Sequence, residues 1–399
     1  MLSVLVPRVG SWAVILPSVE WGAMTSPVSQ WSLDAPLSAV PEAVHKVLSH
    51  YFEESSQEFS AIGREFDQAV SYLKDFVLLG GKRVRPMFAW AGLRAGLEGG
   101  GGSLSIPFPD DATVNPAALL TAVSALELIQ ACALIHDDII DKSDTRRGHP
   151  TTHRRFESEH REKGWLGSSE HYGVSQAILT GDLALAWADD MLHDSGVSAQ
   201  ALGNVRIPWR AMRSEVIAGQ ILDVTVEANG SEDVEDSYKV MEYKTASYTV
   251  ARPLHLGAAL VGADEQVVEL LRAVGHDVGV VFQLRDDQLG VFGDPSMTGK
   301  PSGDDLRTGK RTALINLALA QGTESDVDKL TKSLGTVQDE ADIDVLREII
   351  VRTGAAQAIE EEIQIRSRRA IDALQDSPLD AGIKTELTGL TEKLSNRKF

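Results

Sequence analysis

The feature that most constrains this chain is the helical spacing of its apolar residues, which recur every three or four positions from about Ala39 onward. No convincing run of alternating, β-branched residues interrupts this pattern, so no strand is predicted. The sequence predicts an all-α fold, as a single large bundle of about ten or more helices. The predicted helices cover Val40–Phe52, Phe59–Leu79, Arg83–Leu97, Ala117–Asp138, Val174–Leu192, Ala199–Glu227, Asp236–Gly262, Ala263–Leu289, Leu314–Gln321, Asp342–Gln375 and Leu379–Leu394.

Polar or glycine-rich segments separate the predicted helices and are expected to be loops. They are Glu98–Asn115, Glu157–His171, Ala228–Asp236 and Pro295–Lys310. No repeat and no interdomain linker stands out, so residues 36–399 are predicted to form one domain. Residues 1–35 are expected to be a disordered or dispensable extension, because their apolar run lacks the positive start and unbroken core of a signal peptide. Translation from Met24 is a simple account of that segment.

Net charge and cysteine content exclude several classes of protein. The 399-residue chain has a formal net charge of −20, which argues against a general nucleic-acid binder because such proteins present a basic surface. A small anionic substrate is not excluded, since a local basic cluster or a bound metal reverses the field inside a pocket. Cys132 is the only cysteine, which excludes an intrachain disulfide and favours a reducing, cytoplasmic location. No stretch of about 20 apolar residues predicts a transmembrane segment.

An acidic motif, HDDIID at His136–Asp141, ends one of the predicted apolar helices. Asp137 and Asp141 are four residues apart and therefore lie on one helical face, with Asp138 beside them. Carboxylates this close repel one another unless a cation neutralises them, and Mg²⁺ binds one or two carboxylates together with water and phosphate oxygens. The motif predicts a Mg²⁺ site, and a solvated helix end is the simpler alternative.

A second acidic motif ends another apolar helix at Asp286 and Asp287, with Gln283 before it and Asp294 after it. Two such helix ends predict carboxylates that face each other across one cavity. A third acidic group consists of Asp189, Asp190 and Asp194. The offset between its first and last members turns about 140° around a helix, so this group is interpreted as a solvated face.

Two basic segments lie before and after the first acidic motif. The earlier one reads GGKRVRP and places Lys82, Arg83 and Arg85 at the start of a helix. Arginine makes bidentate bonds to phosphate oxygens, and a helix N-terminus adds positive potential. The later one supplies Arg146 and Arg147. Alone, the first segment is also consistent with a basic surface turn, but together the two favour a protein that binds two diphosphate groups.

Six motifs occur in the order found in trans-isoprenyl diphosphate synthases, and the chain resembles that family. They are GGKRVRP, DDIID followed by RRGHPT, GQILD at Gly219–Asp223, YKTASYT at Tyr243–Thr249, FQLRDD, and GKPSGDD at Gly299–Asp305. The resemblance spans about Gly80 to Lys310. It implies the isoprenoid synthase fold, in which helices surround a central substrate cavity. It also implies Mg²⁺-dependent head-to-tail condensation of isopentenyl diphosphate with an allylic diphosphate, in an enzyme that is usually a homodimer.

The resemblance implies a role for each candidate residue. The expected ligands of about three Mg²⁺ ions are Asp137, Asp138, Asp141, Asp286 and Asp287. The expected contacts of the allylic diphosphate are Arg146, Lys244 and Lys300. The expected contacts of isopentenyl diphosphate are Lys82, Arg85, Gln130 and Arg147, and Arg83 is also expected to bind substrate. The residues expected at the reacting centre are Lys244, Thr245 and Gln283. The basic tail Arg397-Lys398 resembles a segment that closes the pocket in some relatives.

Gly290 marks one departure from the family pattern. The second acidic motif usually reads DDxxD, whereas Gly290 stands here in the place of its last aspartate. Because glycine cannot ligate a metal, one fewer ligand contact is expected. A weak or regulatory subunit is the alternative, and it is disfavoured because both basic segments are intact.

Product length is expected to depend on the residues four and five positions before Asp137, which are Ala133 and Cys132. Aromatic side chains at these positions plug the pocket in farnesyl-producing relatives, and both residues are small here. Ile129 and Leu126 are expected to form a deeper floor. The expected product is geranylgeranyl diphosphate, with farnesyl or a longer polyprenyl diphosphate as alternatives. A class I terpene cyclase is disfavoured, since it would not need GGKRVRP.

Overall fold

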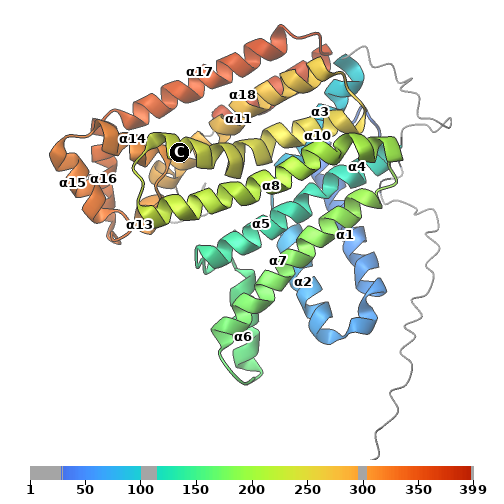
Figure 1. Cartoon of the computed structure of the whole chain (residues 1–399), viewed down its shortest axis with the longest axis horizontal. Helices are drawn as coiled ribbons and strands as arrows, with labels where there is room; N and C mark the ends of the chain where they lie inside the picture. The colour runs from blue at the N-terminus through green and yellow to red at the C-terminus, as the bar shows by residue number, and fades with distance from the viewer. Residues whose placement is uncertain (1–27, 29, 100–114, 295–302, 397–399) are drawn as a thin grey trace, which may run out of the picture.

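The computed structural model describes residues 28, 30–99, 115–294 and 303–396. Within these ranges the protein is a bundle of helices with one short two-stranded sheet (Figure 1). The elements are η1 (Leu37–Ala39), α1 (Val40–Glu58), η2 (Ser60–Ile62), α2 (Arg64–Leu78), α3 (Val84–Gly99), α4 (Pro116–Ser124), α5 (Leu126–Ile140), β1 (Thr145–Arg146), β2 (His149–Pro150), α6 (Thr152–Glu162), α7 (Ser169–His193), α8 (Ala199–Asn229), α9 (Val234–Val240), η3 (Met241–Ala251), α10 (Arg252–Leu260), α11 (Glu265–Phe292), α13 (Asp304–Thr308), α14 (Ala313–Gln321), α15 (Glu324–Ser333), α16 (Glu340–Arg352), α17 (Ala355–Gln375) and α18 (Ala381–Ser395). The all-α fold predicted from the sequence is confirmed.

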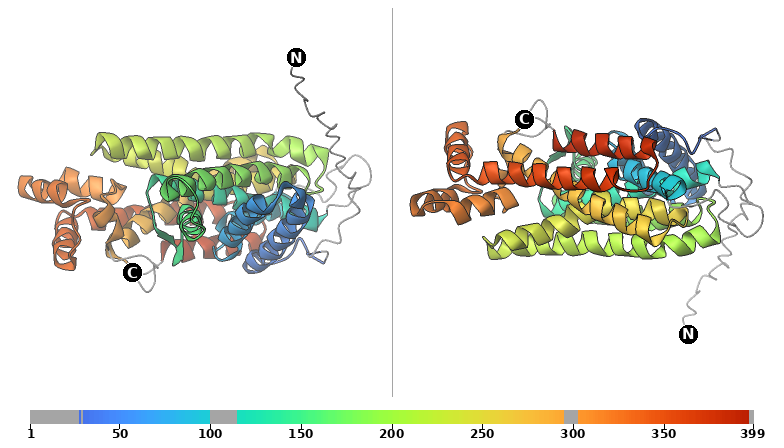
Figure 2. Two further views of the ribbon diagram at one scale, coloured as in Figure 1. Left: turned by 90° about the horizontal axis from the view of Figure 1, so that it is seen from below. Right: turned by 90° about the horizontal axis from the view of Figure 1, so that it is seen from above.

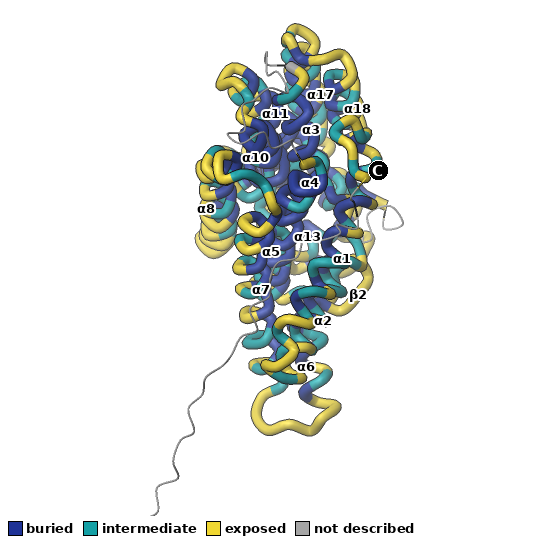
Figure 3. Tube along the Cα trace, turned by 90° about the vertical axis from the view of Figure 1, so that its right-hand side faces the viewer, coloured by how far each residue is buried: buried dark blue, intermediate teal, exposed yellow. Residues whose placement is uncertain are grey.

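The helices α3, α10 and α11 form much of the buried centre of the bundle (Figure 3). On α3, Trp90 is fully buried and meets Trp31 edge-on, with 5.5 Å between the ring centroids. Trp31 belongs to the segment 1–35 that was expected to be disordered or dispensable. The described part of that segment, residues 28 and 30–35, therefore contributes to the core, and the expectation for its other residues falls outside the described ranges.

A smaller hydrophobic core lies at one end of the elongated bundle, where α15 and α16 project beyond the other helices (Figure 2). Leu306, Leu314 and Leu346 from this end pack with Leu284 of α11. Because α11 also supplies Leu271 to the main core, this helix connects the two cores. Its carboxyl-terminal half, which carries the second acidic motif, packs in the small core through Leu284.

The segment η3 is a π-helix wedged between α8 and α11. A Cβ atom on Gly219 of α8 would lie 2.3 Å from the backbone nitrogen of Lys244, and one on Gly279 of α11 would lie 2.6 Å from Cα of Ala246. Only glycine permits both approaches. The single helix predicted over Asp236–Gly262 is consequently three segments, α9, η3 and α10, and π-helical turns are frequent at functional sites.

An ion-pair cluster fixes α11 to its neighbours α17 and η3. Asp277 is buried and accepts hydrogen bonds from Arg366 (3.1 Å) and Arg369 (2.5 Å) of α17. Burial alone would raise the pKa of Asp277, but His276, Arg369 and Arg366 outweigh it and lower the pKa to about 2. His276 also lies 2.6 Å from Glu242 of η3, so the same cluster anchors the π-helix.

Three further predicted helices are interrupted. Gly63, with φ of 126°, separates η2 from α2 within the predicted Phe59–Leu79 helix. Ala125 separates α4 from α5, and Gly354, with φ of 85°, separates α16 from α17. Positive φ is readily adopted only by glycine, but a glycine inside an apolar repeat does not by itself reveal which conformation it takes.

The prediction of a loop at Glu157–His171 was wrong over most of its length, because α6 continues to Glu162 and α7 begins at Ser169. Apolar residues are too few in α6 for a periodic signal. One face nevertheless buries Phe156, whose ring lies 4.8 Å from that of Tyr72. Two more helices were missed. One is the five-residue α13, which lies inside the predicted loop Pro295–Lys310, and the other is the polar helix α15.

One described stretch, Pro116–Ile140 in α4 and α5, is long and apolar enough to cross a membrane by length and composition alone. Of its most apolar window, 78% is buried inside the bundle. Burial of this extent is typical of a core helix, whose apolar residues pack against other helices.

Candidate active site

The β1–β2 hairpin, which was not predicted, positions the two arginines that follow the first acidic motif. Arg146 pairs with His149 across the strands, which leaves Arg147 and Gly148 as a two-residue turn. Both turn residues have positive φ, 54° and 78°, as a type I′ turn requires. Arg146 and Arg147 therefore occupy a strand and a tight turn, and their positions are set by backbone geometry.

The side chain of Arg147 lies across the diglycine Gly80-Gly81. A Cβ atom on Gly80 would sit 3.1 Å from Cδ of Arg147, and one on Gly81 would sit 3.4 Å from its guanidinium nitrogens. Gly81 also has φ of 108°, which other residues rarely adopt. The two glycines thus allow the GGKRVRP segment and the hairpin to meet.

Arg147 has a surplus of positive neighbours. Burial, together with repulsion from Arg83, Arg146 and Arg85, lowers its pKa, while Glu127 acts in the opposite direction. Beside it is a cavity of about 270 Å³, lined by Asp75, Phe76, Leu79, Arg146, Arg147, His149, Pro150, Thr152 and Arg155. Since guanidinium stays protonated in proteins, the positive charge gathered here suits this cavity to an anion.

Arg83, which was predicted to contact substrate, is not among the residues that line this cavity. Its side chain is 5% exposed, and its guanidinium donates to Glu127 (2.5 Å) and to the carbonyl of Val77 (2.5 Å). A buried arginine with a carboxylate partner has its charge neutralised inside the protein. Arg83 therefore anchors the GGKRVRP segment to α2 and α5.

Arg85 is held by two neighbours from η3. Its Nη2 donates a 2.9 Å hydrogen bond to Oγ1 of Thr249, and its guanidinium carbon lies 4.1 Å from the centre of the Tyr248 ring. Lys82 is exposed at the start of the same segment, and Gln130 is partly buried on α5. Lys300, Arg397 and Lys398 lie outside the described residues, so the predictions made for them stay predictions.

The first acidic motif meets its cations at the end of α5. Asp137 accepts hydrogen bonds from Arg146 (3.1 Å) and Lys244 (3.1 Å). Burial raises the pKa of Asp137, but the two cations outweigh it, so the pKa is lowered. Asp138 is 1% exposed and accepts a 2.6 Å bond from Arg146. Burial, only partly offset by Arg146, raises the pKa of Asp138 to about 6.

Lys310 and Asp223 belong to this charge cluster, and sequence reasoning assigned a role to neither. Lys244 donates a 2.5 Å hydrogen bond to Asp223, and Lys310 lies 3.8 Å from Asp141. Burial, with repulsion from Asp137, raises the pKa of Asp141. The signals were present, since Asp223 ends the GQILD motif and Lys310 follows the GDD segment.

The second acidic motif divides between the surface and the interior. Asp286 is exposed, whereas Asp287 is buried and accepts a 2.7 Å hydrogen bond from Gln283. Burial, followed by repulsion from Asp305, raises the pKa of Asp287 well above its ordinary value. Asp287 and Gln283 therefore act on each other, one helical turn apart.

The structure explains why glycine stands at position 290. An ideal Cβ at Gly290 would lie 2.0 Å from one carboxylate oxygen of Asp305 and 2.4 Å from its Cγ. A side chain at this position would require the Asp305 carboxylate of α13, which lies against α11, to move. Burial lowers the pKa of Lys310, but nearby acidic groups raise it, and Asp305 has the largest effect among them. A carboxylate is thus present at this end of α11, although it comes from another helix.

The remaining predicted residues lie on the same elements. Thr245 is partly buried on η3, next to Lys244, and Ala133 is partly buried on α5. Cys132 is 9% exposed, and its Sγ lies 3.8 Å from Nδ1 of His136. The acidic group interpreted as a solvated face is partly engaged, because Asp189 accepts hydrogen bonds from Trp209 (2.5 Å) and Arg213 (2.7 Å).

The donor atoms of the cluster fit Mg²⁺. Within the described ranges no three His, Cys, Asp or Glu side chains converge closely enough to hold a metal by themselves, but Mg²⁺ takes only one or two carboxylates and completes its shell with water and phosphate oxygens. One carboxylate oxygen of Asp138 is buried without a hydrogen-bond partner, and a buried oxygen of this kind calls for a cation or an ordered water. Asp137 and Asp141 would share such a site.

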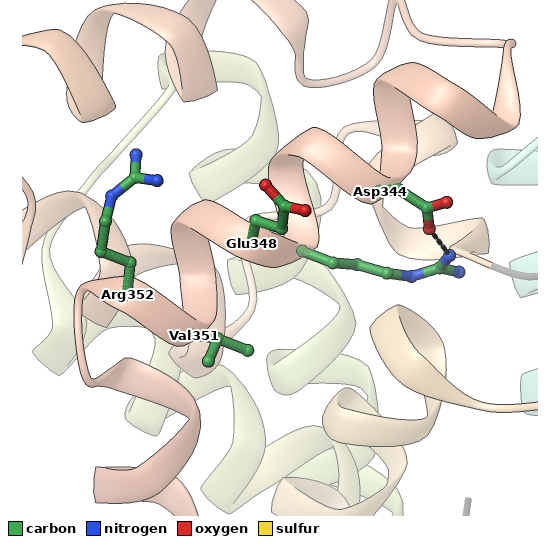
Figure 4. A pocket seen from close by; sticks show the side chains of 5 residues that line it. Asp344, Glu348, Val351 and Arg352 are labelled. Carbon is green, nitrogen blue, oxygen red and sulfur yellow. Dashed lines mark hydrogen bonds and ion pairs between the residues drawn. The ribbon is translucent and has the colours of Figure 1, made fainter.

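Another cavity, of about 420 Å³, lies on α16 and is remote in sequence from every predicted residue (Figure 4). It is lined by Asp344, Arg347, Glu348, Val351 and Arg352. Arg347 is already paired there with Asp344 at 2.7 Å. This surface has no surplus of either charge and is not the candidate site.

The chain matches the family model for polyprenyl synthetase over residues 66–352. It belongs to this family. The sequence is 32% identical over 324 residues to a geranylfarnesyl diphosphate synthase from Aeropyrum pernix, which covers 80% of this chain and 91% of the relative. It is 33% identical over 211 residues to a (2E,6E)-farnesyl diphosphate synthase from Mycobacterium tuberculosis, covering 53% of this chain and 54% of the relative.

A solved geranylgeranyl pyrophosphate synthase from Corynebacterium glutamicum, complexed with isoprenyl diphosphate and magnesium, has the same architecture. It superposes with a TM-score of 0.84 at 44% sequence identity, over 91% of this chain and 100% of that one. The resemblance seen in the sequence is confirmed, as is the isoprenoid synthase fold. This polyprenyl synthetase is a prenyltransferase, and its relatives make products of different length.

We predict that Gly290→Asp, which would complete the usual acidic motif, impairs the protein. The new side chain would displace Asp305, so stability should fall by about 1–3 kcal/mol, as in other overpacked sites. Gly290→Ala should show a smaller loss in thermal unfolding and prenyl-transfer assays. Gly203→Ala is the matched control, because a Cβ there meets no atom within 4 Å. Undiminished stability and activity of Gly290→Asp would show that Asp305 does not fill this space.

Proposed function

We propose that this protein makes all-trans geranylgeranyl diphosphate from isopentenyl diphosphate and an allylic diphosphate, with about three Mg²⁺ ions. The observation that carries the proposal is the pair of adjoining charge sites, one acidic and one basic, that meet at Arg146. Arg146 binds Asp137 and Asp138 on one side and lines the basic cavity with Arg147 on the other. Two diphosphates and a metal require this combination of charges.

The allylic diphosphate belongs at the acidic site. Asp137, Asp141 and Asp286 would hold Mg²⁺, with Asp138 and Asp287 in support, and bound Mg²⁺ would stabilise charge on the leaving diphosphate. Lys244 and Arg146 would exchange part of their contact with Asp137 for the phosphate oxygens. Such fixed positive groups stabilise the leaving group as the allylic C–O bond breaks toward a carbocation.

Isopentenyl diphosphate belongs at the basic cavity. Arg147, Arg85 and Lys82 would bind its diphosphate, and the apolar wall of Phe76 and Leu79 would face its hydrocarbon. Its double bond attacks the carbocation, and a proton is then lost to complete the new alkene. The released diphosphate can accept that proton. Thr245 and the Gln283 amide would stabilise the cation through their dipoles, with water excluded because it would trap the cation as an alcohol.

The growing chain should run along α5, away from the diphosphate. Ala133 and Cys132 are small, and below them Ile129 and Leu126 are 2% and 0% exposed. Small side chains at the first two positions favour a product longer than fifteen carbons, and Ile129 and Leu126 would form the floor of the pocket. Farnesyl and longer products are the alternatives, since the relatives include farnesyl and geranylfarnesyl synthases.

We predict that Ala133→Phe shifts the main product from geranylgeranyl to farnesyl diphosphate. A phenyl ring four residues before Asp137 would fill the channel below the reacting end. Chromatography of products from labelled isopentenyl diphosphate, with dimethylallyl, geranyl and farnesyl primers, measures the shift. Ala133→Ser is the control of nearly unchanged size. An unshortened product from active Ala133→Phe enzyme would contradict this position for the channel.

We also propose a cytoplasmic homodimer. Its support is the apolar stripe exposed on α8, made up of Ile207, Ile217, Ile221 and Val224, with exposed fractions of 61%, 52%, 62% and 40%. Exposed apolar side chains gathered on one helix mark interaction sites. Light scattering should therefore give about twice the chain mass of 43.1 kDa, and Ile221→Asp should lower it to that of the monomer. A monomeric wild-type protein would contradict the proposal.

A further inference from the structure

Arg85 is a cation whose charge no described side chain neutralises. Its polar contact is the 2.9 Å hydrogen bond to Thr249, its guanidinium stacks on the Tyr248 ring at 4.1 Å, and its Nε is buried without a hydrogen-bond partner. Arg83, two residues earlier, has the opposite environment because Glu127 neutralises it. The same segment therefore contains one arginine that is paired with a carboxylate and one that has no carboxylate partner among the described residues.

A guanidinium that binds an anion has to be oriented by neighbours that do not neutralise its charge. A carboxylate partner would orient Arg85 but would also compete with a diphosphate for it. A hydroxyl group and an aromatic face orient a guanidinium and leave its charge available. Tyr248 and Thr249 are only 3% and 1% exposed, so packing fixes both side chains.

We propose that Tyr248 and Thr249 are positioning residues that aim Arg85 at the diphosphate of isopentenyl diphosphate. This inference rests on the proposed function. Both residues belong to η3, which carries Lys244 and Thr245 four residues earlier. One rigid π-helix therefore sets the distance between the cation at the allylic site and the arginine at the isopentenyl site.

The contact from Tyr248 is made by its ring. The Tyr248 hydroxyl is buried and has no hydrogen-bond partner, and burial raises its pKa. Removal of the hydroxyl alone therefore preserves the stacking on Arg85, whereas removal of the ring abolishes it. Thr249 differs, because its hydroxyl is the group that accepts the bond from Arg85.

The first test is steady-state kinetics of Thr249→Val, which keeps the shape of the side chain and removes the acceptor. The KM for isopentenyl diphosphate should rise about tenfold, the usual effect of losing a hydrogen bond to a charged group, with little change in kcat or in the KM for the allylic diphosphate. Tyr248→Leu should act in the same direction. The conservative variants Thr249→Ser and Tyr248→Phe should restore the KM to within about twofold.

Thr225→Val on α8 is the matched control, since that hydroxyl bonds only to a carbonyl of its own helix. An unchanged KM for isopentenyl diphosphate in Thr249→Val, or an equal rise for both substrates, would overturn the inference. The wild-type enzyme meanwhile tests the proposed function by itself, because condensation by wild type is independent of these variants.

A double-variant cycle provides the second test. If Thr249 acts through Arg85, Thr249→Val should weaken isopentenyl diphosphate binding in the wild type, measured by calorimetry, and add almost nothing in an Arg85→Ala background. A full additional loss in that background would show that Thr249 acts elsewhere. Calorimetry needs no turnover, so a protein that binds but does not condense would refute the proposed function and leave this inference standing.

Discussion

The arrangement of this protein depends on charge compensation between partly buried lysines and aspartates that come from different helices. Lys310 is half-buried, and burial by itself would lower its pKa, yet Asp305, Asp141, Asp137 and Asp223 raise it. Ions taken from water into a protein interior cost several kcal/mol each unless partners compensate them. The ends of α5, α8, α11 and α13 are therefore obliged to meet at one place, and that place is the candidate active site.

Close helix packing makes this convergence possible. Gly219 and Gly279 let η3 approach α8 and α11, and Gly290 leaves room for Asp305. On the basic side, Gly80 and Gly81 do the same for Arg147. The charged residues are thus brought together by glycines whose missing side chains permit the contact. Catalysis by pre-arranged charges requires such rigidity, because groups that reorganise during the reaction stabilise the transition state less.

Local sequence patterns predicted the helices and the residue types of the site, but they did not predict how tertiary contacts would use those residues. The apolar repeats and the HDDIID motif depend only on helical periodicity, so most helices and the first acidic motif were found. The inward turn of Arg83 depends on Glu127, which is distant in sequence. The replacement of a carboxylate at Gly290 by Asp305 likewise depends on the docking of α13. The polar helix α6 was missed because it has no apolar repeat. Contacts between aromatic side chains, such as Phe156 with Tyr72, stabilise it instead.

Titration of the protein with MgCl₂, with and without an inert allylic diphosphate analogue, most directly tests the compensation of the aspartates by lysines. In the wild type, Mg²⁺ alone should bind weakly, because Lys310 and Lys244 already neutralise the carboxylates. We expect Lys310→Met to tighten the binding of Mg²⁺ alone and to weaken the binding of the analogue, whereas Lys329→Met, at an exposed position, should change neither. Weaker or unchanged Mg²⁺ binding in folded Lys310→Met protein would contradict the compensation of these aspartates by Lys310.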